Sequence, residues 1–282
     1  MQKSRQDLLQ FSRVKHLAKK EGRELYALLN LAIAQKTTRI RRENISRVVF
    51  YPDYNIAFNR IGKSGNSSVI FYLREAINPP TSRQETYKEG KRAAMKIGKS
   101  LIELSRHRGE LSRLDKISFF TVVRNPWTRT LSAFLDKIAN GPEEKYGSIP
   151  GFGKNSREGF AAFVSFLGDG GLHANHHWKP QKDVLLLPAA HFKSICRLEH
   201  LASELPQALS ATGLTLPTSD HLQQPHRIES DDPGKITNAS SRLAKYYSPE
   251  TLDAIANLYA GDFALGRYSC DPRSIGLSTA TF

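Results

Sequence analysis

The chain has 282 residues, 39% of them hydrophobic, and this length fits one large α/β domain with a sizeable core. It carries 41 basic and 27 acidic residues, and the net charge of +14 predicts an anionic ligand or partner surface. The sequence contains no zinc-finger spacing, RNA-recognition aromatic motif or apolar run of about 18 residues, so we expect neither nucleic-acid binding nor a membrane span. Cys196 and Cys270 lack metal-site spacing, which predicts reduced thiols and a cytoplasmic protein.

Residues 1–46 form a basic N-terminal extension in which apolar positions recur at helical spacing. Gly22 divides the two apolar runs, and we predict two amphipathic helices. We expect this extension to pack on the main domain, residues 47–282. Its basic and apolar character could also make it a peripheral contact with the inner face of a membrane.

The stretch Tyr54–Ile77 has the pattern of a strand, a polar turn and a helix, preceded by a hairpin turn at Pro52–Asp53. Gly62 and Gly65 allow close backbone approach or positive φ in the polar turn. The N-terminus of the following helix offers free N–H groups and a positive dipole end, and Lys63 adds a cation. The segment therefore predicts binding of a phosphate-bearing ligand.

A second strand–turn–helix unit follows a long basic stretch. Residues 117–123 (ISFFTVV) have the composition of a buried parallel strand, which ends at Arg124, and Pro126 suits the first position of a helix. The apolar runs 184–187 and 192–198 are further strand candidates. Parallel strands end at the same edge of a sheet, so both turns can bind one ligand. We predict an α/β fold with a P-loop-like central parallel sheet flanked by helices.

Two other functions fit part of this pattern. Residues 57–64 satisfy a loose form of the nucleotide P-loop, which allows an ATP-dependent kinase. Against it, Phe58 and Ile61 are bulky where a P-loop wraps phosphate, and the second strand ends in Arg124 where an Asp would hold Mg²⁺. The basic charge alone would also fit a polyanion-binding module without enzymatic activity.

Histidines are the candidates for a general base. His107 precedes the second strand, and a cluster at His173, His176 and His177 follows it. The cluster spacing would allow a metal site, but no carboxylate lies within it, so we expect no metal.

These motifs resemble those of carbohydrate sulfotransferases of sulfotransferase family 2, which use 3′-phosphoadenosine 5′-phosphosulfate (PAPS). Residues 59–68 (NRIGKSGNSS) look like the 5′-phosphosulfate loop of the uronyl 2-O- and chondroitin-type branch. Residues 124–134 (RNPWTRTLSAF) match the 3′-phosphate motif R-x-P-x-x-R-x-x-S-x-F at every specified position. Three later landmarks are similar to those of the family: HWKPQ at 177–181, RLE at 197–199 and YAGDF at 259–263.

The resemblance implies an enzyme that binds PAPS without a metal and leaves 3′-phosphoadenosine 5′-phosphate as product. Lys63 would contact the phosphosulfate, while Arg124 and Ser132 would hold the 3′-phosphate, with Arg129 as a second cation there. The backbone after Lys63 would cradle the phosphosulfate through Ser64, Gly65, Asn66, Ser67 and Ser68.

The resemblance also implies in-line transfer of the sulfuryl group to a hydroxyl of an acidic or cell-surface saccharide, with help from a general base. His107 or His177 would be that base, and Arg60 and His176 would face the acceptor. The relatives carry a Golgi membrane anchor and cysteines after the His-Trp pair. Neither feature occurs in this sequence, which fits the cytoplasm of a bacterium.

Overall fold

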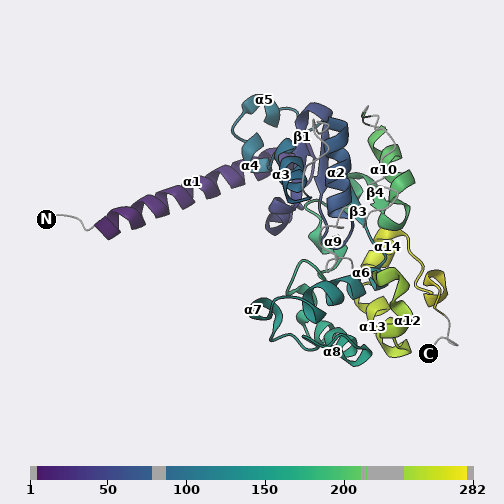
Figure 1. Cartoon of the computed structure of the whole chain (residues 1–282). Helices are drawn as coiled ribbons and strands as arrows, with labels where there is room; N and C mark the ends of the chain where they lie inside the picture. Colours follow the sequence, from purple (N-terminus) through teal and green to yellow (C-terminus); the bar gives the residue numbers. More distant parts are fainter. Residues whose placement is uncertain (1–4, 78–86, 211, 213, 215–237, 278–282) are drawn as a thin grey trace.

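The computed structural model describes residues 5–77, 87–210, 212, 214 and 238–277. Its centre is a four-stranded sheet in the order β1-β2-β3-β4 (Figure 1). The strands are β1 (Val48–Tyr51), β2 (Ile56–Asn59), β3 (Ser118–Val123) and β4 (Phe192–Arg197). β1 and β2 form the predicted antiparallel hairpin, whereas β2, β3 and β4 are parallel. The α/β class and the mainly parallel sheet are therefore confirmed.

Helices surround the sheet and form a second body below it (Figure 1). The helices of the first half are α1 (Arg5–Ala34), α2 (Asn66–Ile77), α3 (Tyr87–Ile97), α4 (Leu101–Leu104), α5 (Arg108–Leu111), α6 (Pro126–Ala133), and the π-helical turn η3 (Phe134–Ala139) that continues α6. Those of the second half are α7 (Glu143–Tyr146), α8 (Arg157–Gly168), α9 (Gln181–Val184), α10 (Leu201–Ser210), α12 (Leu243–Tyr246), α13 (Pro249–Leu258) and α14 (Ala260–Gly266). None of the described helices is both long and apolar enough to cross a bilayer.

The sheet buries both faces because its side chains alternate between two hydrophobic clusters. Phe119 belongs to the cluster that includes α1 and α4, and the next residue, Phe120, belongs to the cluster that includes α2 and α10. A third cluster, built from α6, α8, α13 and α14, is rich in aromatic side chains such as Trp127 and Phe134. The turn between β3 and α6 is therefore held at both ends, because β3 belongs to the sheet and α6 packs in the aromatic cluster.

The apolar run 184–187 is not a strand, contrary to the sequence prediction. It is the end of α9 and an irregular segment, in which Leu185, Leu186 and Leu187 are buried. Its backbone groups pair with two buried asparagine side chains: Asn59 Nδ2 donates to Val184 O, Leu186 N donates to Asn59 Oδ1, and Asn44 Nδ2 donates to Leu185 O. Because side chains satisfy these groups, the segment needs no neighbouring strand.

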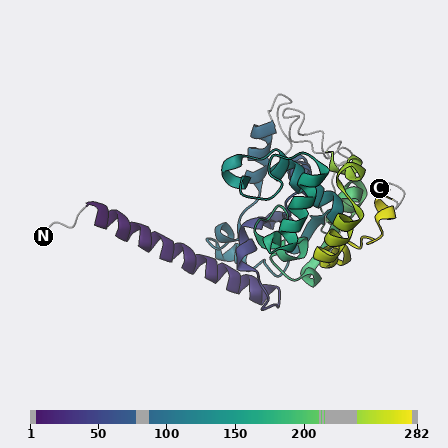
Figure 2. The ribbon, with the colours of Figure 1, turned by 90° about the horizontal axis from the view of Figure 1, so that it is seen from below.

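The N-terminal extension is one helix, α1, and not the two helices that Gly22 suggested. A single glycine inside a helix costs only about 1 kcal/mol, which neighbouring helix formers offset. Ala27 and Leu31 are fully buried against the domain, while Leu25 and Leu29 on the other side are exposed. The N-terminal part of α1 extends away from the body (Figures 1 and 2).

The two sides of α1 predict opposite outcomes for the same substitution. Leu31→Ala removes a fully buried side chain and should lower the free energy of unfolding by about 2–5 kcal/mol. Leu29→Ala, at 54% exposure, should change it by less than about 0.5 kcal/mol. Urea denaturation of the two variants measures this difference. Equal losses would mean that α1 does not pack through the Leu31 side.

Candidate functional site

The first element of the site is the turn of residues 60–65 between β2 and α2. Lys63 and Gly65 both adopt positive φ, at 65° and 73°, and a Cβ at Gly65 would lie 2.5 Å from Leu198 Cδ1. The left-handed conformation is unfavourable for a lysine and is typical of residues held for a function. The turn ends where α2 begins at Asn66, so the first backbone N–H groups of this 12-residue helix face the turn.

Lys63 belongs to a cluster of three charged side chains that the sequence did not predict. Its Nζ lies 3.2 Å from Asp136 Oδ2, and Lys137 Nζ lies 2.9 Å from the same oxygen. Burial lowers the pKa of Lys63, although Asp136 opposes this shift. Burial acts to raise the pKa of Asp136, but the two lysines bring it below its ordinary value. The Asp136 carboxylate thus pairs with two ammonium groups. Asp136 and Lys137 lie in the π-helical turn η3, and such turns are frequent at functional sites.

The second turn follows β3 and begins α6. Asn125 caps the helix, because its side chain accepts a hydrogen bond from Trp127 N, and Pro126 occupies the first helical position as predicted. The Arg124 guanidinium donates to Thr128 Oγ1 (3.0 Å) and to the carbonyl oxygen of Lys63 (3.3 Å). Burial lowers the pKa of Arg124 to about 10, so it remains a cation at neutral pH. The predicted phosphate-binding turns are therefore in direct contact.

Gln181 joins the same two turns from a third direction. Its side chain is fully buried: Oε1 accepts from Ser64 Oγ (3.0 Å) and Arg124 N (2.9 Å), and Nε2 donates to Arg124 O (2.8 Å). The backbone of Gln181 is fixed in turn by the buried Asp262, whose carboxylate accepts from Gln181 N (2.7 Å) and Lys182 N (3.0 Å). The HWKPQ landmark at 177–181 and the YAGDF landmark at 259–263 are thus in contact through the Asp262 carboxylate.

Two of the predicted donor-binding residues lie on α6. Ser132 is buried there, one helical turn beyond Thr128. Arg129 is 1% exposed, and its guanidinium donates to three backbone carbonyls, those of Gly62, Lys179 and His176. These contacts tie the first turn to the His-Trp segment. They give Arg129 a structural role, and its expected role as a phosphate cation stays a prediction.

His176 and His177 lie beside the first turn. A Cβ at Gly62 would be 3.2 Å from both His176 O and His177 Nδ1, so glycine permits this approach. Burial, with Arg47, Lys137 and Arg129 nearby, lowers the pKa of His176 to about 4. Burial, with His176, Lys137 and Lys63 nearby, lowers the pKa of His177 to about 3. Both imidazoles are therefore neutral at pH 7.

The other candidate base, His107, is exposed in the turn between α4 and α5. Within the described ranges its contacts are backbone hydrogen bonds to Leu104, Glu110 and Leu111. The structure therefore brings His177, and not His107, to Lys63.

Arg60 lies at the start of the first turn, where a second arginine joins it. Arg60 Nη2 donates to Ser46 O (2.7 Å), and burial together with the nearby Arg47 lowers the pKa of Arg60. Arg60 Nε is buried and has no hydrogen-bond partner among the described residues. Arg47 also acts on His176, so the two arginines and the histidine cluster share one electropositive region.

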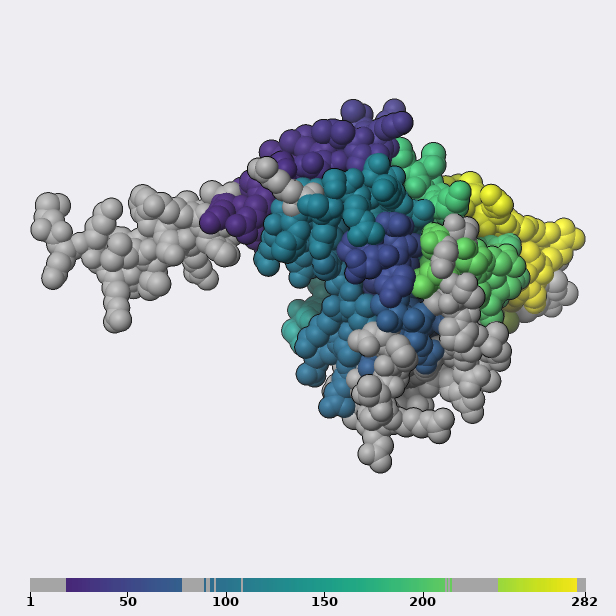
Figure 3. Space-filling model, turned by 90° about the horizontal axis from the view of Figure 1, so that it is seen from above, coloured from purple at the N-terminus to yellow at the C-terminus, as the bar shows by residue number. Residues whose placement is uncertain are grey.

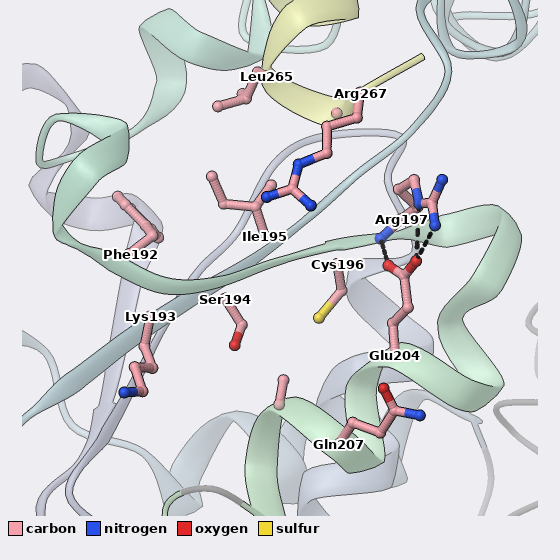
Figure 4. A pocket seen from close by; sticks show the side chains of 12 residues that line it. Phe192, Lys193, Ser194, Ile195, Cys196, Arg197, Glu204, Gln207, Leu265 and Arg267 are labelled. Atoms are coloured by element: carbon pink, nitrogen blue, oxygen red, sulfur yellow. Dashed lines mark hydrogen bonds and ion pairs between the residues drawn. The ribbon is translucent and has the colours of Figure 1, made fainter. Parts of the chain in front are cut away.

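One cavity lies apart from these turns. It measures about 460 Å³ and runs along the free edge of β4 between α10 and α14 (Figure 4). Arg197 and Glu204 form an ion pair of 2.6 Å in it, but no residue of the turns at 60–68 and 124–132 lines it. In the described part of the chain, no group of three His, Cys, Asp or Glu side chains is placed to hold a metal.

Sequence reasoning missed four of the side chains that shape the site: Arg47, Asp136, Lys137 and Gln181. Only Gln181 could have been found from the sequence, because it ends the HWKPQ landmark.

The sequence profile of the sulfotransferase family matches residues 46–269, which is most of the chain. The chain matches no curated protein and no solved structure. The family match favours sulfuryl transfer over the kinase and the non-enzymatic polyanion binder.

The two histidine pKa values predict a pH dependence. Exposed histidines titrate near 6.5, whereas His176 and His177 should remain neutral down to about pH 5. Their folded pKa values are lower than the unfolded ones, so the stability that they contribute is present above about pH 6.5 and falls as the pH drops below it. NMR titration of the imidazole C–H resonances measures both values. A midpoint near 6.5 for both residues would contradict this prediction.

The Gln181 amide predicts a specific loss. Gln181→Leu leaves Ser64 Oγ and both backbone groups of Arg124 buried without partners, each at a cost of about 1–3 kcal/mol. The matched control is Gln207→Leu, which alters an exposed glutamine on α10 and should change stability by less than about 0.5 kcal/mol. Thermal and urea unfolding compare the two. Similar stabilities would show that the amide does not hold the turns together.

Proposed function

The chain belongs to the sulfotransferase family and is a sulfotransferase, and we propose that it transfers the sulfuryl group of PAPS to a hydroxyl of an acidic saccharide. The observation that supports the donor most strongly is the contact between the two turns. Arg124 reaches the carbonyl of Lys63 at 3.3 Å, so one compact ligand with two anionic ends can engage both. PAPS carries a phosphosulfate and a 3′-phosphate on one adenosine, which fits this demand.

The phosphosulfate would lie at the N-terminus of α2. There, backbone N–H groups and the helix dipole favour an anion, and Lys63 supplies a full charge. Ser64 to Ser68 form this cradle. The 3′-phosphate would lie along α6, where the Arg124 guanidinium reaches Thr128 and Ser132 follows one helical turn later.

Asp136 adds a step that precedes transfer. Its carboxylate pairs with Lys63 at 3.2 Å in a partly buried location. When the anionic donor arrives, its phosphosulfate competes with Asp136 for the Lys63 ammonium, and Lys137 remains to pair with the carboxylate at 2.9 Å. Lys63 can then stabilise the charge that develops on the departing phosphate.

In the transfer itself, the acceptor oxygen forms a bond to sulfur as the bond from sulfur to the phosphate oxygen breaks. The hydroxyl proton must leave at the same time, and His177 is the best-placed group to accept it. Its imidazole lies beside the turn that holds Lys63, and burial together with the nearby cations keeps it neutral at pH 7. The negative charge of the bound donor would raise its pKa toward a value useful for a base.

The preference for an acidic acceptor follows from the charges on the open side of the first turn. Arg47 and Lys137 lie near the histidine pair, and Arg47 also lies near Arg60, as their effects on the pKa values of His176, His177 and Arg60 indicate. A uronate carboxylate or an existing sulfate would offset these cations, and a guanidinium can bind either group through paired hydrogen bonds.

The 3′-phosphate proposal predicts selective loss of affinity. Arg124→Ala should weaken binding of 3′-phosphoadenosine 5′-phosphate about 10–100-fold, because a charge-assisted contact is lost, while binding of AMP should change little. Isothermal titration calorimetry of both ligands measures the ratio. Arg106→Ala, at an exposed arginine outside the site, is the control. Equal losses for the two nucleotides would exclude Arg124 as the 3′-phosphate residue, provided that circular dichroism reports a folded variant.

A further inference from the structure

One face of α1 is apolar and exposed. Within the described ranges, the exposed large hydrophobic side chains are Leu25 (55%), Tyr26 (46%), Leu29 (54%) and Ile33 (77%), and all four lie on this helix. Leu25, Leu29 and Ile33 recur at every fourth residue and so form a stripe along one face. The opposite face is already used, because Ala27 and Leu31 are buried in the domain core. The exposed stripe is therefore additional to what folding requires.

Exposed cations lie before and after the stripe in the chain. Lys19, Lys20 and Arg23 are exposed before it, and Lys36 and Arg39 are exposed after it. In the described segment 19–39 the acidic residues are Glu21, which is exposed, and Glu24, which pairs with Arg42 at 2.7 Å. The stripe thus has exposed cations beyond both of its ends, with Glu21 as an exposed acid in line with it.

The exposed apolar side chains and the cations distinguish among three partners for the stripe: a nucleic acid, a second copy of the chain and an anionic bilayer. A nucleic acid would need the cations but not four exposed apolar side chains. A second copy would cover the apolar stripe but would bring the same five exposed cations together, which is repulsive. A stable dimer also buries about 800 Å² per partner, more than a stripe of three helical turns offers. An anionic bilayer meets both demands, with acyl chains for the stripe and head groups for the cations.

We propose that α1 docks the protein on an anionic phospholipid surface, with the Leu25, Leu29 and Ile33 stripe in the head-group region. The 30-residue helix would lie along the surface over about 45 Å. Figure 3 shows the described part of α1 at one side of the molecule, where other elements do not cover it. Docking through this face leaves the Ala27 and Leu31 face in the core, so the domain need not unfold. The proposal does not depend on the identity of donor or acceptor.

Flotation of the full chain with vesicles tests this proposal. The protein should float with vesicles that contain phosphatidylglycerol, and less with phosphatidylcholine alone. Leu29→Ser with Ile33→Ser should weaken binding about ten-fold or more, and Lys19→Ser with Arg23→Ser should weaken it and reduce its salt sensitivity. The matched control replaces two exposed lysines on the helical body, Lys145→Ser with Lys154→Ser, and should leave binding unchanged.

Three outcomes would overturn the proposal. The first is no flotation of the wild-type chain, and the second is equal flotation with neutral and anionic vesicles. The third is a dimer, detected by analytical ultracentrifugation, that Leu29→Ser with Ile33→Ser converts to a monomer, which would assign the stripe to a second copy. The stripe variants should keep full sulfuryl transfer to a soluble acceptor, so this test and that of the proposed function can fail independently.

Discussion

The side-chain amide of Gln181 is the interaction on which the site depends. It satisfies one hydroxyl and two backbone groups from two different turns, and the Asp262 carboxylate fixes its own backbone. Because all of these groups are buried, none can exchange its partner for water, and the relative position of the turns is over-determined. Two local strand–turn–helix units thereby become a single site. Arg129 strengthens this frame by binding carbonyls of both the first turn and the His-Trp segment.

The contacts of Gln181 and Arg129 hold several cations close together. This arrangement costs free energy that an anionic ligand can offset. Lys63, Arg124 and Arg129 are largely removed from water, and burial lowers the pKa of each. Asp136 provides partial compensation, and the neighbouring histidines stay neutral because of burial and the nearby cations. Such a site is prepared for a multiply charged anion, since binding relieves repulsion that the fold maintains.

Much of the fold could be predicted from local patterns. The hairpin, the strand before Arg124 and the strand at 192–197 each depend on short apolar runs with clear ends. The run at 184–187 had the same pattern but is irregular, because Asn59 and Asn44, more than 120 residues away in sequence, satisfy its backbone. Gly22 suggested a break between two helices that does not occur. The free-energy cost of one glycine inside a helix is small compared with the packing of the rest of α1.

The positions of the motif residues Lys63 and Arg124 could also be predicted, whereas the side chains that pair with them could not. Lys63 and Arg124 stand at strand ends, where the sequence alone indicates their environment. Asp136 approaches Lys63 only because α6 continues into a π-helical turn, and no local pattern announces this change of helical register. His107 and His177 were equivalent candidates from the sequence. In the structure His177 lies beside the turn that holds Lys63, whereas His107 lies on the exposed turn between α4 and α5.

The most direct test of the account is transfer of labelled sulfuryl from PAPS to a uronate-containing saccharide and to its carboxyl-reduced form, by the wild type and by Lys63→Ala. We expect the wild type to label the uronate form preferentially, and Lys63→Ala to lose at least about 10²-fold in rate with the fold intact. Wild-type turnover by Lys63→Ala would contradict the assignment of the first turn to the phosphosulfate.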